Sequence, residues 1–167
     1  MEFWKEIKGY NGKYLISSQG RVKSTTSGTD KILSQNKNAK GYYKVNLSNG
    51  RKSHKQFPIH RLLAEYFIPN PNKELYINHI NGERHYNSLD NLEWVNIREN
   101  TTHGIKLNRK HSYKTGVYCY NKKGKYISII TINGITNKLG IFDSEEDAHL
   151  AYKNALISNG LTNKYAQ

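Results

Sequence analysis

Cysteine is almost absent from this chain of 167 residues, because Cys119 is the only one. A single thiol cannot form an intramolecular disulfide, which predicts a reducing compartment, and it excludes a zinc site built from several thiolates. Long apolar runs are also missing: no stretch approaches the roughly 20 residues needed to span a bilayer. The opening residues, Met1 to Glu6, lack the pattern of a signal peptide. We therefore expect a soluble, intracellular protein without a membrane partner.

Negative charge is scarce, since 13 Asp and Glu stand against 26 Lys and Arg, for a net charge of +13. Such an excess predicts a polyanionic partner, with nucleic acid first. The charge is unevenly placed: residues 1–57 carry +9, residues 58–104 carry −2 and residues 105–167 carry +6. A merely solvated basic surface is the alternative, but it does not need an acidic centre. Basic flanks that hold phosphates around a centre that accepts a cation fit a metal-dependent nuclease.

The first two thirds of the chain predict short strands, turns and small helices. Residues 1–57 have glycine-punctuated β patterns, and Asn49-Gly50 is a strong hairpin turn. Residues 60–67 change to helical spacing, and Pro69 stops that helix. Two short strands then follow, near residues 76–77 and 92–95, and a further helix is expected to begin at Ile97.

The last third predicts one compact unit after a basic linker. Residues 105–115 are rich in Lys and Arg and poor in apolar groups, which is typical of a linker or an arm. Three strands are expected within residues 117–141, and then a helix from about Glu145 to Ser158, with Ser144 as its N-cap. The fold class is α+β, and the expected segments are 1–57, 58–104, 105–115 and 116–162.

Three asparagines and one histidine form a spaced set in the acidic centre: Asn78, His79, Asn91 and Asn100. A histidine at a strand end can act as a general base near neutral pH. Phosphodiester hydrolysis also needs a cation to offset charge, and a group that holds the base in the correct tautomer. The amide oxygens of Asn78 and Asn100 suit a hard cation such as Mg²⁺, and Asn91 is expected to hydrogen-bond and orient His79.

Residues 59–103 resemble the HNH endonucleases of the phage homing type. The matching stretches are His60-Arg61-Leu62, Phe67-Ile68-Pro69-Asn70-Pro71, Asn78-His79-Ile80-Asn81-Gly82, the run from Asn87 to Trp94, and Glu99-Asn100. The resemblance implies a ββα-metal (His-Me finger) core with His79 as the base, Asn91 as the residue that orients it, and Asn100 as a metal ligand. Asn78 stands where some members have a metal-binding Asp. The implied cofactor is one Mg²⁺ or Mn²⁺ ion, without zinc or a small-molecule cofactor.

Both flanks have resemblances of their own. The N-terminal segment, with Trp4-Lys5-Glu6-Ile7 and Gly20-Arg21-Val22-Lys23-Ser24, looks like the small NUMOD4-like DNA-binding module that often precedes HNH domains. Residues 116–162 are similar to the AP2-type DNA-binding domain, whose three-stranded sheet, backed by a helix, reads the DNA groove; Tyr126 stands where that pattern usually has Trp. The side chains expected to contact DNA are Arg21, Lys23, Arg61, Lys106, Arg109, Lys110, Lys122, Lys123 and Lys125.

Together these features predict a site-specific endonuclease acting on double-stranded DNA. One HNH site per chain predicts a monomer that nicks one strand and leaves 5′-phosphate and 3′-hydroxyl ends, whereas a dimer would cut both strands. The expected location is the cytoplasm of a bacterial host, with a phage gene as the source. Two alternatives remain open: a DNA-binding regulator that keeps a non-catalytic HNH fold, and a nonspecific nuclease. His60 also has two readings, as a structural residue and as a phosphate contact.

Overall fold

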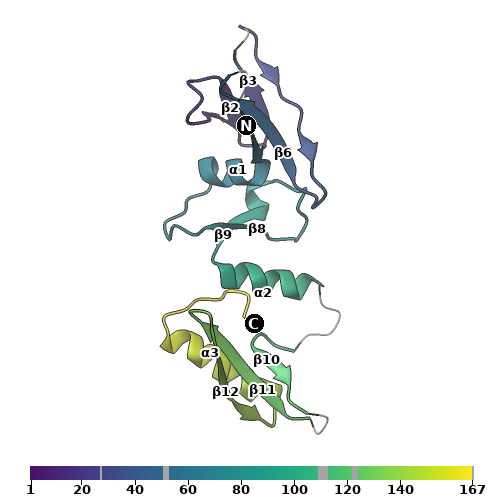
Figure 1. Cartoon of the computed structure of the whole chain (residues 1–167), viewed down its shortest axis with the longest axis vertical. Helices are drawn as coiled ribbons and strands as arrows, with labels where there is room; N and C mark the ends of the chain where they lie inside the picture. The colour runs from purple at the N-terminus through teal and green to yellow at the C-terminus, as the bar shows by residue number, and fades with distance from the viewer. Residues whose placement is uncertain (27, 51–52, 109–112, 122–123, 167) are drawn as a thin grey trace. The chain divides into compact units, whose positions relative to one another are not determined.

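The computed structural model describes residues 1–26, 28–50, 53–108, 113–121 and 124–166. The chain divides into a first unit, Met1–Asn96, and a second unit, Ile97–Gln167, and each is described by itself. Figure 1 shows small sheets and helices in both units, which confirms the α+β fold class. Within the described ranges, no helix is long and apolar enough to cross a membrane.

Two small antiparallel sheets begin the first unit. The first has the order β1 (Trp4–Glu6), β2 (Tyr14–Ser17), β3 (Val22–Ser24) and β4 (Lys31–Ile32). The second has the order β5 (Asn36–Lys37), β6 (Tyr43–Ser48) and β7 (His54–Pro58). The pairing of Ser48 with His54 confirms the hairpin predicted around Asn49-Gly50.

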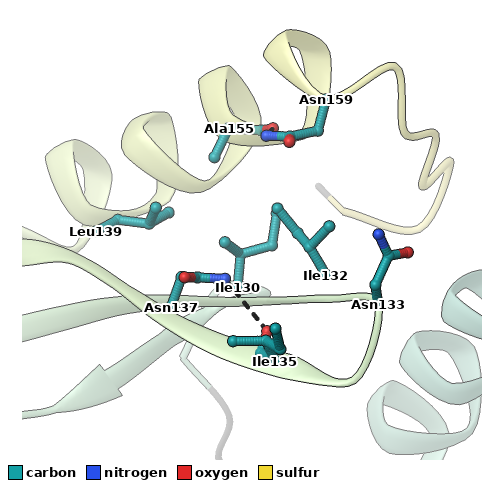
Figure 2. Close-up of a pocket in the computed structure, with 8 residues that line it drawn as sticks. All are labelled: Ile130, Ile132, Asn133, Ile135, Asn137, Leu139, Ala155 and Asn159. Atoms are coloured by element: carbon teal, nitrogen blue, oxygen red, sulfur yellow. Dashed lines mark hydrogen bonds between the residues drawn. The ribbon is translucent and has the colours of Figure 1, made fainter.

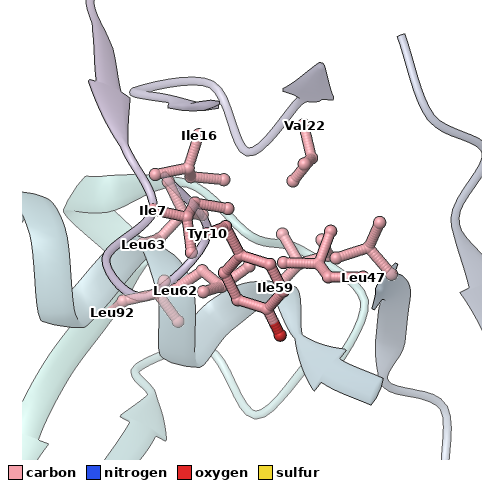
Figure 3. Packing of buried hydrophobic residues seen from close by; sticks show 10 residues of the cluster. Ile7, Tyr10, Ile16, Val22, Leu47, Ile59, Leu62, Leu63 and Leu92 are labelled. Carbon is pink, nitrogen blue, oxygen red and sulfur yellow. The ribbon is translucent and has the colours of Figure 1, made fainter. Parts of the chain in front are cut away.

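Helix α1 (Ile59–Phe67) follows β7 directly and supplies the centre of the core. Pro69 ends it, because a proline restricts the preceding residue to extended backbone, and Ile68 has φ −108° and ψ 119°. Figure 3 shows aliphatic side chains of α1 interlocked with those of the sheets and of β9. The buried cluster comprises Ile7, Tyr10, Ile16, Val22, Val45, Leu47, Ile59, Leu62, Leu63 and Leu92. Residues on both sides of position 57 therefore share one core.

A two-stranded antiparallel sheet completes the first unit. It pairs β8 (Tyr76–His79) with β9 (Leu92–Val95), in a register that places His79 opposite Leu92 and Asn78 opposite Glu93. A 3₁₀ turn, η1 (Leu89–Asn91), leads into β9. Since Leu92 belongs to the core around α1, this hairpin is anchored by packing as well as by backbone hydrogen bonds.

The second unit begins with helix α2 (Ile97–Asn108). The predicted start at Ile97 is confirmed, but the helix continues through residues 105–108, which were expected to be linker. Glu99 in its first turn and Lys106 in its last have the charges that a helix dipole favours at those ends, which explains why this polar segment is helical.

The rest of the second unit is a sheet backed by a helix (Figure 1). Strands β10 (Val117–Cys119), β11 (Tyr126–Ile132) and β12 (Ile135–Phe142) pair antiparallel in chain order. Helix α3 (Glu145–Ser158) is capped by Ser144, whose Oγ accepts from the backbone N–H of Asp147 at 3.0 Å, as predicted. The buried cluster between this sheet and helix consists of Ile130, Tyr152, Leu156 and Ala166.

An open hollow of about 440 Å³ lies between α3 and the β11–β12 hairpin (Figure 2). It is lined by Ile130, Ile132, Asn133, Ile135, Asn137, Leu139, Ala155 and Asn159. None of these side chains is acidic, basic or a histidine, so the hollow holds no group suited to hydrolysis. The candidate site lies instead on the β8–β9 hairpin of the first unit.

Candidate active site

His79 is the last residue of β8 and is only 4% exposed. Its Nε2 lies 3.1 Å from Oδ1 of Asn87, in the loop that joins β8 to β9. An amide oxygen can only accept, so Nε2 must carry the proton and donate it. The lone pair of the neutral ring is then on Nδ1, which is the atom able to take a proton from water.

The surroundings of His79 favour this neutral ring. Burial lowers the pKa of His79 below its ordinary value, and the positive charge of Arg84 acts in the same direction. The hydrogen bond with Asn87 raises the pKa but does not reverse the shift. A neutral imidazole is the form that a general base needs.

Asn91 takes a different position from the one expected. Its Nδ2 donates to Oδ1 of Asn81 at 3.0 Å and to the carbonyl of Tyr86 at 2.8 Å, and its Oδ1 accepts from the N–H of Asn81 at 3.0 Å. These bonds hold the two ends of the β8–β9 loop together, and none of them reaches His79. The direct contact is made by Asn87, because the loop folds back over the histidine. Asn91 therefore shapes the loop that carries Asn87.

Asn78 is buried beside His79 and is tied to the opposite strand. Its Nδ2 donates to Oε1 of Glu93 at 2.9 Å. This bond fixes the amide orientation, so Oδ1 is the atom through which Asn78 would contact a cation. Oxygen donors of this kind suit Mg²⁺ or Mn²⁺. Asn100 lies on α2, in the second unit.

Among the described residues, no three or more His, Cys, Asp or Glu side chains form a group able to hold a metal ion.

Two aromatic rings, those of His60 and Tyr42, form a cluster with the candidate base. The ring of His60 lies 5.2 Å from that of His79, and Tyr42 lies 4.9 Å from His60 and 5.9 Å from His79. The pKa of His60 is lowered to about 4. Burial is the main cause, and the nearby His79 and Arg61 act in the same direction. Nδ1 of His60 is buried and has no hydrogen-bond partner among the described residues. Sequence reasoning had left His60 open and had not singled out Tyr42.

Comparison with known proteins decides the family. Residues 2–48 match the NUMOD4 motif, and residues 57–102 match the HNH endonuclease model. The chain is 33% identical over 132 residues to the DNA endonuclease I-HmuI of Bacillus phage SP01, covering 79% of this chain and 74% of that protein. This chain belongs to the HNH endonuclease family. The expected HNH and NUMOD4 resemblances are confirmed, whereas the AP2-type assignment of residues 116–162 stays a prediction.

Other relatives of this HNH chain agree. It is 40% identical over 146 residues to the uncharacterized HNH endonuclease L247 of Acanthamoeba polyphaga mimivirus, which covers 84% of this chain but only 36% of that protein. The chain thus spans little more than a third of that relative's length. A solved structure described as DNA binding and cleavage by the HNH homing endonuclease I-HmuI matches with a TM-score of 0.58 and 28% identity, over 96% of this chain and 84% of that one.

The basic residues expected to contact DNA in the first unit already have partners. Arg21 is paired with Glu2, and Lys23 Nζ lies 2.6 Å from a carboxylate oxygen of Asp30. Arg61 donates to the carbonyl of Leu75 at 2.7 Å and approaches Glu65 at 3.4 Å. The side chains of Arg21 and Arg61 are exposed, whereas that of Lys23 is only 18% exposed, and each of the three is paired with a carboxylate of the protein.

The other basic residues expected to contact DNA in this HNH chain lie in the second unit or outside the described residues. Lys106 is exposed on α2, and Lys125 forms an ion pair with Asp143. Arg109, Lys110, Lys122 and Lys123 lie outside the described residues. On the sheet, Tyr118 and Tyr120 are 49% exposed, and Nζ of Lys138 lies 5.3 Å from the ring of Tyr120. Lys138 had not been singled out from the sequence, because a lone lysine in a strand carries no signal.

Proposed function

We propose that this chain is a metal-dependent, site-specific DNA endonuclease that nicks one strand, with His79 as its general base. The observation that carries the proposal is the buried His79, whose Nε2 is held by Asn87 so that Nδ1 bears the lone pair. Attack of water on phosphorus that breaks the P–O3′ bond would leave a 5′-phosphate and a 3′-hydroxyl.

Each residue of the site has a separate task in this proposal. Nδ1 of His79 removes a proton from the attacking water, and Asn87 keeps the ring in the required tautomer. Asn91 holds the loop that positions Asn87. A bound Mg²⁺ or Mn²⁺ would stabilise charge on the phosphoryl and leaving oxygens. Asn78 and Asn100 are its proposed ligands, and the HNH match over residues 57–102 contains both.

Double-stranded DNA is the proposed partner, bound by a monomer in the cytoplasm of a bacterial host cell. The chain has 26 basic and 13 acidic residues, and this excess of positive charge supports a polyanionic ligand. We assign the N-terminal segment and the exposed face of β10–β12 to DNA contact, with Lys106 and Lys125 among the contributing side chains. Binding that neutralises several phosphates weakens steeply as salt is raised, so a flat salt dependence would contradict it.

The deciding experiment compares wild type with His79→Ala and with His54→Ala as a matched control, since His54 is an exposed histidine of β7. Each protein is incubated with supercoiled plasmid and phage DNA in Mg²⁺ or Mn²⁺, and the ends are sequenced. We expect defined nicks with wild type and His54→Ala, and loss of about 1,000-fold in rate with His79→Ala. Scattered ends would defeat site specificity.

The amide at position 78 favours one other function for the chain, that of a DNA-binding regulator that does not cleave DNA. An amide holds a cation less strongly than a carboxylate, because it carries no net charge. Wild-type protein that binds a defined DNA tightly but never nicks it, in either metal ion, would establish this alternative and exclude the endonuclease.

A further inference from the structure

The turn between β5 and β6 reaches the β8–β9 loop, which follows the candidate base His79. Asn38 shapes this turn, since its Oδ1 accepts from the backbone N–H of Lys40 at 3.0 Å and of Tyr42 at 2.9 Å. Gly41 has φ +89°, and a β-carbon there would lie 3.8 Å from Cβ of Arg84. Two segments far apart in sequence are thus in contact within the first unit.

Arg84 is held in place by this turn. Its Nη1 donates to the carbonyl of Lys40 at 3.2 Å, and its guanidinium carbon lies 5.4 Å from the ring centre of Tyr42. A cation over an aromatic face is attracted by the ring's negative electrostatic potential, which favours this orientation. The same Tyr42 ring packs against His60 and His79, so one side chain joins the arginine to the base.

Arg84 differs from the three first-unit cations predicted to contact DNA, because no carboxylate is paired with it among the described residues. Arg21, Lys23 and Arg61 each lie within ion-pair distance of a carboxylate. For Arg84, no such pair occurs among the described residues. A guanidinium has five N–H donors in a planar fork, and the carbonyl of Lys40 accepts from only one of its nitrogens, Nη1. The remaining donors match the oxygens of a phosphate.

We propose that Arg84 binds the DNA phosphate that lies against His79, and that Tyr42, from the N-terminal segment, is the positioning residue that holds Arg84 there. The inference rests on the proposed function and extends it. The NUMOD4-matched segment, residues 2–48, then contributes to the chemistry at the nuclease site as well as to DNA binding.

The proposal makes Arg84 act on the rate of cleavage and not mainly on affinity. A fixed guanidinium beside the reacting phosphate stabilises the charge that develops on its oxygens in the transition state. A lysine cannot replace it fully, because its ammonium is a point charge without the planar fork. A change of Tyr42 should act through Arg84, so its effect should vanish once Arg84 is removed.

The test uses a DNA fragment with one site that wild type nicks. Two quantities are measured: the kcat of nicking at saturating DNA with Mg²⁺, and the Kd for the same DNA in EDTA. Variants are Arg84→Gln, Arg84→Lys, Tyr42→Ala, Tyr42→Phe and the double variant Tyr42→Ala with Arg84→Gln. Lys55→Gln is the matched control, because Lys55 is likewise a cation over an aromatic ring, 5.2 Å from that of Phe57. We expect kcat to fall about 100-fold in Arg84→Gln and about tenfold in Tyr42→Ala, and to stay near wild type in Tyr42→Phe and Lys55→Gln.

The outcomes separate this inference from the proposed function. If wild type nicks and Arg84→Gln changes Kd but leaves kcat unchanged, then Arg84 is an ordinary backbone contact and the inference fails alone. If Tyr42→Ala lowers kcat further in the Arg84→Gln background, Tyr42 acts on His60 or His79 and its assigned role is wrong. Wild type that never nicks its bound DNA overturns both proposals.

Discussion

The two units hold their proposed functional groups in different ways. The first buries those of the candidate site: His79, Asn78 and Asn91 are all less than 10% exposed, above a core centred on α1. The second has the smaller cluster around Ile130 and Tyr152 and leaves tyrosines of its sheet exposed. Buried, hydrogen-bonded groups have fixed positions, which chemistry requires, whereas exposed rings and lysines suit recognition of a large partner.

The largest change in stability is expected at Gly116 in the second unit. It has φ +81°, and a β-carbon there would overlap the ring of Tyr152. We expect Gly116→Ala to destabilise the second unit by about 4 kcal/mol, from steric overlap and backbone strain together. Both tryptophans, Trp4 and Trp94, belong to the first unit. In urea, circular dichroism should therefore show early unfolding while tryptophan fluorescence still reports a folded first unit.

Gly134→Ala is the matched control for this prediction. Gly134 has φ +80° but nothing within 4 Å of a β-carbon, so only backbone strain remains and we expect a loss of about 1 kcal/mol. Equal effects of the two substitutions would mean that the contact with Tyr152 does not limit the second unit.

In the first unit, Asn91→Ala and Asn87→Ala should separate loop structure from catalysis. Asn91→Ala removes three hydrogen bonds of a buried side chain, so we expect a loss of about 3 kcal/mol in unfolding free energy. Asn87→Ala removes the one bond to His79, and should cost about 1 kcal/mol but lower the nicking rate at least tenfold. Tryptophan-monitored denaturation and nicking assays measure both, and the reverse ranking of stabilities would contradict the loop role of Asn91.

The same pair shows how far the sequence could predict the site. The spacing of Asn78, His79 and Asn91 placed them correctly on the β8–β9 hairpin, because strand and turn signals are local. Which asparagine touches His79 depends on how the loop folds back, and no local pattern contains that. Likewise, the link from Tyr42 to Arg84 joins residues far apart in sequence, so only the packed core around α1 brings them together. The strands of residues 117–142 were predictable, whereas the length of α2 depended on a polar segment with weak periodicity.

A smaller effect should appear in the pH dependence of the first unit. The pKa of His60 is lowered to about 4 from its ordinary value of 6.5, mainly by burial. As pH falls, the unfolded chain binds this proton first, so stability is lost below pH 6.5 and levels off near pH 4. We expect a loss of roughly 2 kcal/mol, reduced for partial exposure. His60→Phe keeps a ring without the proton, and should lose less stability between pH 7 and 4.5 than wild type in urea titrations; identical losses would show that other groups cause the effect.

The smallest expected effect concerns the amide beside the base. Asn78→Asp would place a carboxylate against Glu93, whose Oε1 now accepts from Asn78 at 2.9 Å. Without metal the two charges repel, and we expect a loss of about 1 kcal/mol in EDTA. With metal the added charge should lower the Mg²⁺ concentration for half-maximal nicking about tenfold, equal to ~1.4 kcal/mol. Asn46→Asp adds the same charge at an exposed position of β6 and should change neither quantity. An unchanged Mg²⁺ requirement in Asn78→Asp would remove Asn78 from the proposed ligands.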